Sequence, residues 1–162
     1  MHLALVLTLL ALLGAANGAP VLAKRVLGAR WSWPLDGGLR FFDGRPLFGT
    51  SKTWRGIVSS VVVTAAIAPV LGISAGIGAL FAAAAMLGDL FSSFVKRRLS
   101  KASSSQALGL DQVPESLLPL LVCWNVLGLT LADAAVTLAL FFVGELLLSR
   151  LLYRLHIRDR PY

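Results

Sequence analysis

The chain has 162 residues, of which 57% are hydrophobic and only 14% are charged, and its mean hydropathy is +0.79. Soluble globular domains carry about a quarter charged residues, so this composition excludes a soluble domain, a disordered tail and a coiled coil. The single cysteine, Cys123, excludes a disulfide scaffold. We therefore interpret residues 1–162 as one all-α integral membrane domain. The net charge of +7 does not indicate a nucleic-acid partner, because apolar segments separate the basic residues.

Five apolar stretches approach the length of about 20 residues that a helix needs to cross the hydrocarbon core. In chain order they cover residues 3–23, 56–73, 75–95, 117–131 and 134–153, and the fourth is short. The first stretch has the Leu-rich run and small residues of a signal peptide. However, Met1 and His2 provide no basic segment before it. We interpret it as a retained span, with cleavage as the alternative.

A proline near the end of the first span predicts a break in that helix. The segment is Asn17-Gly18-Ala19-Pro20, and proline lacks the backbone N–H that the helix would use. Freed backbone groups at membrane depth are tolerated where they line a cavity or are buried in protein. We expect this segment to face the interior.

The Lys and Arg residues fall into three regions of the chain. Seven lie between the first and second spans, four follow the third span, and four close the fifth: Lys24, Arg25, Arg30, Arg40, Arg45, Lys52, Arg55; Lys96, Arg97, Arg98, Lys101; Arg150, Arg154, Arg158, Arg160. Five spans place all three regions on one side, which the positive-inside rule makes cytoplasmic. This predicts a multi-pass protein of the cell (inner) membrane with its N-terminus outside, its C-terminus cytoplasmic, and cytoplasmic loops at 24–55 and 96–114.

The loop at 24–55 mixes glycines, cations and hydroxyl groups. Glycine permits close backbone approach to a ligand, and Lys52, Thr53 and Arg55 provide hydrogen-bond donors for phosphate oxygens. The spacing does not match a Walker A motif, but the loop leads directly into the second span, whose helix N-terminus would favour an anion. The alternative is a flexible basic loop on anionic lipid.

An acidic residue, Asp89, lies inside the third span. A carboxylate at the bilayer centre costs about 2.5–3.5 kcal/mol on insertion scales, so such residues mark functional sites by default. Helical spacing places Ser92, Ser93 and Lys96 on the same stripe as Asp89, with Arg97 at its edge. The stripe predicts the wall of a polar cavity that opens to the cytoplasm, with a structural hydrogen bond between helices as the alternative.

Three further carboxylates lie in or beside the fourth and fifth spans. Asp111 precedes the fourth span, where it would cap the helix or join Asp89 in binding Mg²⁺. Glu145 in the fifth span fits a functional and a structural role equally well. Asp133, between the fourth and fifth spans, is interpreted as a turn residue on the outer side.

The residue inventory favours phosphoryl chemistry. The spans contain no histidine that could act as a general base. A phosphomonoester has a second pKa of about 6, so it is already an ionised nucleophile at neutral pH. Joining two phosphates requires charge neutralisation and positioning, which a divalent cation and a cradle of Lys and Arg would provide.

These segments resemble the CDP-archaeol synthase family, which is related to bacterial CDP-diacylglycerol synthase. The resemblance rests on Asn17-Gly-Ala-Pro20, on Phe48-Gly-Thr-Ser-Lys-Thr-Trp-Arg-Gly56, on Gly88-Asp-Leu-Phe-Ser-Ser-Phe-Val-Lys-Arg-Arg98 and on Leu110-Asp-Gln112, and it covers essentially the whole chain. It implies a five-span, Mg²⁺-dependent cytidylyltransferase that converts CTP and a phosphatidic-acid-like lipid phosphate into CDP-lipid and pyrophosphate.

The resemblance also implies roles for individual residues. Asp89 and Asp111 would bind the metal and act in catalysis with Lys96. The remaining positions would bind CTP or phosphate: Asn17, Pro20, Asp36, Lys52, Thr53, Arg55, Arg97 and Arg98. Asp111 stands ten positions after Lys101, farther than in the diacylglycerol enzymes, which makes its equivalence weaker than that of Asp89.

The sequence has features of two other functional classes. Asp36-Gly-Gly-Leu-Arg40 faintly resembles the start of the CDP-alcohol phosphotransferase motif, but its two further aspartates at fixed spacing are missing. A small transporter or non-catalytic membrane subunit is the alternative outside enzymes, although a transporter would show helix breaks in two repeats and the sequence suggests one. The sequence leaves open a homodimer, and it leaves open an ether-linked or ester-linked lipid.

Overall fold

The computed structural model of the chain describes residues 2–155 and is all-helical apart from turns, loops and two isolated β-bridges. The elements are α1 Leu3–Leu27, α2 Trp54–Ile67, the 3₁₀ helix η1 Ala68–Leu71, α3 Ala75–Arg98, α4 Gln112–Val122, α5 Trp124–Leu127 and α6 Leu131–Arg154. Arg158 and Arg160, which the sequence assigns to the third basic region, lie outside the described residues.

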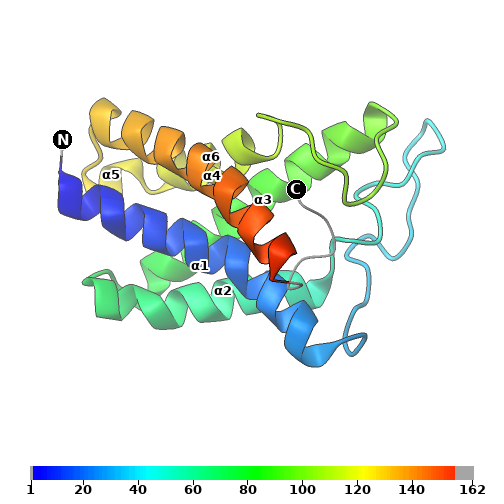
Figure 1. Cartoon of the computed structure of the whole chain (residues 1–162), viewed down its shortest axis with the longest axis horizontal. Coiled ribbons are helices and arrows are strands. Elements are labelled where there is room, and N and C mark those ends of the chain that lie inside the picture. The colour runs from blue at the N-terminus through cyan, green and yellow to red at the C-terminus, as the bar shows by residue number, and fades with distance from the viewer. Residues whose placement is uncertain (1, 156–162) are drawn as a thin grey trace.

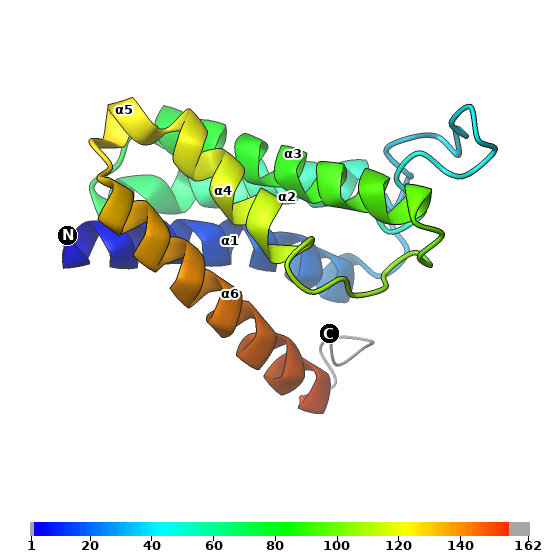
Figure 2. The same cartoon turned by 90° about the horizontal axis from the view of Figure 1, so that it is seen from above.

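The helices run back and forth between two ends of the molecule (Figures 1 and 2). The loops at 28–53 and 99–111 gather at one end, and the N-terminus, η1 and α5 lie at the other. The first two basic regions therefore share one end, as the charge pattern predicts. α6 begins beside α1 and α4 and diverges from them towards its C-terminus (Figure 2).

Four helical segments within residues 2–155 are long and apolar enough to cross a membrane: Leu3–Leu27, Trp54–Leu71, Ala75–Arg98 and Leu131–Leu151. The fourth predicted span, 117–131, is not a single long helix. It is divided between α4 and the one-turn α5, which meet at Cys123. α4 also begins five residues earlier than the sequence indicates, at Gln112.

The apolar core lies towards the end that holds the N-terminus. Leu9, Leu12 and Leu13 of α1 are fully buried there with Phe81 of α3 and Leu120 of α4. Between helices surrounded by lipid, such side chains stabilise the bundle by van der Waals packing rather than by removal from water. Many apolar side chains elsewhere face outward, as expected for helices surrounded by lipid.

Two sequence predictions about helix ends are wrong. α1 continues through Pro20 to Leu27, since proline removes one backbone donor and the flanking turns hold the helix. Asp133 is not a turn residue. It lies in the first turn of α6, fully buried, where it forms a capping box with Thr130 and accepts hydrogen bonds from the backbone N–H of His2 at 2.6 Å and from Thr130.

Candidate active site at the basic end of the bundle

Gly88 brings α3 and α4 into direct backbone contact. A Cβ atom at Gly88 would lie 2.1 Å from the carbonyl oxygen of Pro114 and 2.7 Å from the Cα of Glu115. No side chain fits in that space, so glycine is required there. The contact places the first turn of α4 beside Asp89, the next residue along α3.

The same contact fixes the depth at which α4 begins. Gly88 lies ten residues before Arg98 in α3, which corresponds to about 15 Å along the helix. Residues 99–111, which connect α3 to α4, must return over this distance without forming a helix. Irregular backbone at such depth is tolerated where it lines a cavity or is buried in protein, and here its polar groups contact the charged residues of α3.

Two ion pairs stand at this level of the bundle. Lys52 Nζ lies 2.5 Å from Asp89 Oδ2, and Lys96 Nζ lies 2.6 Å from Asp111 Oδ1. All four side chains are largely buried, between 9% and 23% exposed. Lys96 also donates to the carbonyl of Ser105, and Asp111 Oδ2 accepts from the backbone N–H of Ala107. Asp111 therefore makes no capping hydrogen bond to α4, which removes the helix-cap interpretation.

A third carboxylate, Glu115, lies next to these pairs. Glu115 is 7% exposed and stands in the first turn of α4. The charges that act on it come from Asp89, Glu145, Lys52 and Asp111. Across the same space, Gln112 Nε2 donates to Glu145 Oε2 at 2.6 Å, which ties α6 to the start of α4. The sequence pattern gave no role to Glu115.

The three consecutive cations of α3 point in three directions, because neighbouring residues in a helix are about 100° apart. Lys96 faces Asp111 inside the bundle. Arg97 is 6% exposed and donates to the carbonyl of Ala102 in the following loop. Arg98 donates to Asp43 at 2.7 Å and lies 4.9 Å from the ring centroids of both Phe41 and Phe94. Arg98 therefore clamps the loop at 28–53 onto α3.

Asp36 organises that loop from within. Its Oδ1 accepts from the backbone N–H of Gly38, and its Oδ2 accepts from those of Phe48 and Gly49. Burial alone would raise the pKa of the Asp36 carboxyl, but these backbone donors outweigh it, and the pKa lies below its ordinary value. Both oxygens are thus committed to the loop, so Asp36 holds Gly38, Phe48 and Gly49 together within it.

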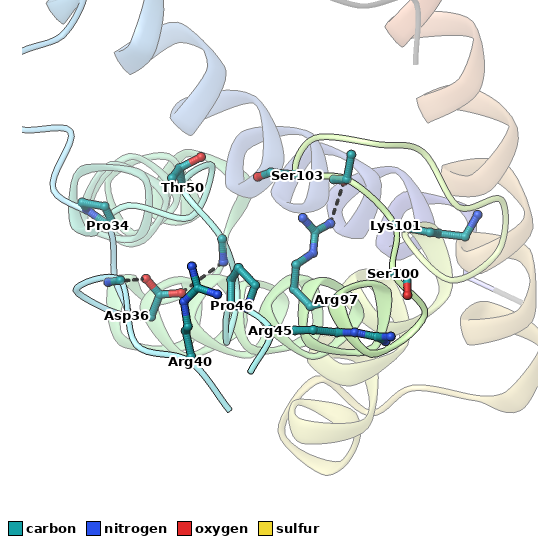
Figure 3. Close-up of a pocket in the computed structure, with 13 residues that line it drawn as sticks. Pro34, Asp36, Arg40, Arg45, Pro46, Thr50, Arg97, Ser100, Lys101 and Ser103 are labelled. Atoms are coloured by element: carbon teal, nitrogen blue, oxygen red, sulfur yellow. Dashed lines mark hydrogen bonds between the residues drawn. The ribbon is translucent and has the colours of Figure 1, made fainter. Parts of the chain in front are cut away.

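A pocket of about 490 Å³ opens between the two loops at this end (Figure 3). Its walls include the cations Arg40, Arg45, Arg97 and Lys101 together with Thr50 and Ser103. Gly49 forms part of the wall with a φ of +93°, and a Cβ there would lie 3.1 Å from Ser103 Oγ and 3.4 Å from an Arg97 nitrogen. Four cations against one carboxylate, Asp36, give this pocket the charge of an anion site.

The remaining sequence-predicted residues lie where α1 meets α2. Thr53 caps α2 by accepting from the backbone N–H of Gly56, and Arg55 donates to the carbonyls of Gly28 and Arg30 at the end of α1. Pro20 packs near Gly56. The amide nitrogen of Asn17 is buried and has no hydrogen-bond partner within residues 2–155, which leaves a donor for a ligand.

Comparison with known proteins identifies the family. The model of the CarS-like CDP-archaeol synthase family matches residues 3–79 and 70–162. A CDP-archaeol synthase of Sulfurisphaera tokodaii is 30% identical over 153 residues, which is 91% of this chain and 89% of that protein. The chain belongs to the CDP-archaeol synthase family.

Other relatives agree over shorter stretches. A CDP-archaeol synthase of Hyperthermus butylicus is 41% identical over 105 residues, and this match spans 61% of the chain and 60% of that protein. One of Pyrobaculum calidifontis is 41% identical over 130 residues, or 76% of this chain and 77% of that protein. A solved structure of an intramembrane enzyme for archaeal membrane lipids biosynthesis superposes with a TM-score of 0.66 at 29% identity, covering 83% of this chain and 89% of that one. The chain is therefore a multi-pass membrane protein.

The residues that this family resemblance selects form two neighbouring groups. Inside the bundle Lys52 pairs with Asp89 and Lys96 pairs with Asp111, whereas Asp36 and Arg97 border the pocket. Arg98, Thr53 and Arg55 are engaged in holding loops and helix ends. Of the predicted stripe of α3, Ser92, Ser93, Lys96 and Arg97 are buried, and the Asp89 side chain is 23% exposed.

The carboxylates at this site fit Mg²⁺ when substrate phosphates supply further oxygen ligands. No group of three His, Cys, Asp or Glu side chains that would hold a metal ion by itself occurs within residues 2–155. Mg²⁺ is commonly held by one or two carboxylates together with substrate phosphates. Asp89, Asp111 and Glu115 supply oxygen ligands of this kind, so they fit a Mg²⁺ ion that arrives with a nucleotide.

Proposed function

We propose that this protein is a CTP-dependent cytidylyltransferase that converts a lipid phosphate into CDP-lipid and pyrophosphate. One observation supports this most directly. The two buried Lys–Asp pairs stand next to a pocket lined by Arg and Lys. A membrane protein has little reason to bury such pairs side by side for stability alone, because the desolvation of two charges offsets much of their attraction.

The reaction joins two polyanions. A phosphate oxygen of the lipid attacks the α-phosphorus of CTP, a new P–O bond forms, and the bond between the α- and β-phosphates breaks to release pyrophosphate. The attacking oxygen is already ionised at neutral pH, so no general base is needed. The protein neutralises the negative charge of the two substrates and aligns the attacking lipid phosphate with the α-phosphorus of CTP.

The lysines are placed to bind phosphate oxygens of both substrates. Lys52 and Lys96 are each held by one aspartate, at 2.5 and 2.6 Å. In a complex with the magnesium nucleotide, Lys52 and Lys96 would each bind a phosphate oxygen, and Asp89 and Asp111 would hold the metal. Charge balance is retained in this arrangement, so the site need not expose an unpaired ion.

The pocket between the loops suits the nucleotide. Arg97, Lys101 and Thr50 line it, and Gly49 leads directly to Lys52 within the same loop (Figure 3). Bound Mg²⁺ would neutralise phosphate charge and stabilise the leaving pyrophosphate, and Asp89, Asp111 and Glu115 would hold it. The buried amide of Asn17 offers a neutral donor on the α1 side of the bundle.

The lipid phosphate approaches from the membrane. The basic end of the bundle would face the cytoplasm, since positive loops do so, and this places the nucleotide pocket in water and the Lys52–Asp89 pair within the membrane-facing bundle. The relatives are named for CDP-archaeol, whose chains are ether-linked, so an archaeol-type ether-linked phosphate is the first substrate to test.

The decisive experiment incubates purified protein with CTP, Mg²⁺ and a panel of ether-linked and ester-linked lipid phosphates. We expect CDP-lipid and pyrophosphate in equal amounts. The Asp89→Asn variant should insert and fold but release no pyrophosphate. Activity of that variant at ordinary Mg²⁺ concentration would contradict the role of Asp89. Transfer of an alcohol to a preformed CDP-lipid would indicate a CDP-alcohol phosphotransferase instead, and absence of CTP binding would favour a transporter.

A further inference from the structure

Three exposed tryptophans lie where α1 ends and α2 begins. Trp31, Trp33 and Trp54 are 64%, 69% and 53% exposed, although the whole chain has only four tryptophans. Neither the buried ion pairs nor the pocket between the loops includes them. Large aromatic side chains contribute most when they are removed from water, so three of them at one place indicate a surface that another component covers.

The backbone holds these tryptophans as one unit, which we call the tryptophan ledge. The backbone N–H of Trp54 donates to the carbonyl of Trp33 at 3.2 Å. Arg55 donates to the carbonyls of Gly28 and Arg30 and so ties the start of α2 to the end of α1. Both helix ends lie at the basic end of the molecule (Figure 1).

Helix length places the ledge at the boundary of the hydrocarbon core. α2 and η1 together form the candidate span Trp54–Leu71. Its 14 α-helical and 4 3₁₀ residues rise about 29 Å in total, at roughly 1.5 and 2.0 Å per residue. The hydrocarbon core is about 30 Å thick. With Leu71 at one boundary, Trp54 therefore lies at the other, where membrane proteins are enriched in tryptophan.

The backbone conformation of Trp31 favours the same location. Its φ of +54° lies in the left-handed region, which strains a bulky residue. Such strain persists where other interactions offset it, and a mostly exposed side chain has little packing within the protein to do so. Insertion of the indole into the bilayer interface is an interaction that would offset the strain.

The charges beside the ledge fit an anionic bilayer. Residues 24–35 include three cations, Lys24, Arg25 and Arg30, and no Asp or Glu. Arg25 and Arg30 are exposed. Cations at the membrane surface attract anionic headgroups, and indole prefers the zone between headgroups and chains. The combination favours lipid over a protein partner as the surface that covers the ledge.

The ledge is joined to Lys52 through the backbone. Lys52 lies two residues before Trp54, and its carbonyl accepts from the backbone N–H of Leu35 at 2.8 Å, beside the bond between Trp54 and Trp33. The side chain of Lys52 pairs with Asp89. The depth of the ledge in the bilayer therefore determines the depth of this ion pair.

We propose that the tryptophan ledge, with Arg25 and Arg30, binds the headgroup region of an anionic bilayer and fixes the depth of the Lys52–Asp89 pair relative to the lipid phosphates. The consequence for Lys52 rests on the proposed function, whereas the contact with the bilayer does not. The tryptophans are positioning residues, since they touch membrane lipid and act on the reaction only through the placement of Lys52.

Depth-dependent quenching of tryptophan fluorescence tests the contact. In a Trp124→Phe background, replacement of two ledge tryptophans by Phe leaves one indole at a time, in vesicles of mixed zwitterionic and anionic lipid. Bromine atoms placed near the headgroup or near the chain end quench indoles at their own depth. We expect each ledge indole to be quenched more strongly by the shallow bromines than by the deep ones, and weakly by iodide in the water.

The tip of the same loop provides a matched control. Phe42 is 98% exposed, and its neighbour Asp43 is bonded to Arg98. Arg98 lies nine residues beyond Asp89 in α3, which is about 14 Å along the helix. The segment at 40–46 projects past the ends of the helices (Figure 1, cyan). Phe42→Trp, as the single tryptophan, should therefore be quenched by iodide and by neither brominated lipid.

A second measurement tests the charge of the lipid. Brominated anionic lipid should quench the ledge more strongly than brominated zwitterionic lipid present at the same fraction. Arg25→Gln and Arg30→Gln should each lower this preference by up to about fivefold, the factor that corresponds to the attraction of one cation to an anionic surface. Equal quenching by the two lipids in the unchanged protein would overturn the choice of an anionic partner.

A third measurement tests the consequence for the reaction. Trp33→Ala combined with Trp54→Ala should raise the KM for lipid phosphate in vesicles several-fold and leave the KM for CTP unchanged. Trp33→Tyr combined with Trp54→Tyr should restore the KM for lipid phosphate, because tyrosine also favours the interface. An unchanged KM for lipid phosphate in the alanine variant would overturn the positioning role.

The other outcomes also decide the proposal. Strong quenching of the ledge by iodide would overturn it, because the ledge would then lie in water and face a protein partner. Protection from iodide and from both brominated lipids, increasing with the density of protein in the vesicles, would overturn it in favour of a second copy of the chain. Failure of the unchanged protein to form CDP-lipid would refute the proposed function and the role of Lys52, while the quenching would still decide the contact with the bilayer.

Discussion

Substitution of Gly88 by alanine tests how closely α3 and α4 must approach. The added Cβ would lie 2.1 Å from the carbonyl oxygen of Pro114. Ordinary contact begins at 3.4 Å, so the two backbones must separate by about 1.3 Å, the difference between these distances. Overpacking of this kind costs about 1–3 kcal/mol. For a chain of this size we expect the melting temperature to fall by about 2–12 °C.

The loss of activity should exceed the loss of stability. The displaced turn of α4 holds Glu115, and Asp111 immediately precedes α4. A misplacement of about 1 Å in an active site can reduce the rate roughly 100-fold. We therefore expect CDP-lipid formation by Gly88→Ala to fall about 100-fold at a temperature where the variant remains folded, measured with saturating CTP.

Gly76 provides the matched control on the same helix. A Cβ at Gly76 meets nothing within 4 Å, so Gly76→Ala should keep wild-type activity and gain up to about 1 kcal/mol from the better helix propensity of alanine. The reasoning would be refuted if Gly88→Ala matched Gly76→Ala in melting temperature and in rate, because the backbone contact would then have no role in forming the site.

Three further predictions concern the loops and Lys52. Lys52→Ala should raise the KM for CTP about 10-fold or more, since a hydrogen bond to a charged group contributes about 1.5–3 kcal/mol; an unchanged KM for CTP beside a raised KM for lipid phosphate would place Lys52 on the lipid. The lowered pKa of Asp36 means that its stabilising effect is complete above the ordinary carboxyl pKa and is lost as the pH falls below about 4 through the lowered pKa. Hydrogen-exchange protection of the Phe48 and Gly49 amides should fall in that range, and Asp36→Asn should lack the transition. Arg98→Lys cannot stack on Phe41 and Phe94 as a planar guanidinium does, so limited proteolysis within residues 41–46 should become faster, and equal cleavage rates would contradict the clamp.

The long helices were predictable because their signal is local. Residues 3–27, 75–98 and 131–154 are mostly apolar, and the sequence placed their outer limits to within a few residues at most ends. The break expected at Pro20 was wrong because the loss of one backbone donor did not end α1, which continues to Leu27. The fourth span was misjudged because Gln112 and Glu115 read as loop residues, whereas packing against Gly88 places them inside the bundle.

The candidate site was predictable where residues share one helix and less so where they come from several. The interior stripe of α3 followed from helical spacing alone. Pairing of Lys52 with Asp89 joins residues 37 positions apart, and local periodicity contains no information about such contacts. Glu115 could have been suspected from one signal, a carboxylate in the first turn of a helix that begins at membrane depth, but that depth is known only once α3 and α4 are packed.

The short length of α4 also bears on how the chain enters the membrane. An 11-residue helix is about 16 Å long, too short to cross the bilayer independently, and it would expose Gln112 and Glu115 to hydrocarbon if it left the insertion machinery alone. We therefore expect α3 to be in place, with Gly88 available for contact, before α4 inserts. A chain truncated after Leu127 and released from the ribosome should integrate α4 only when α3 is intact.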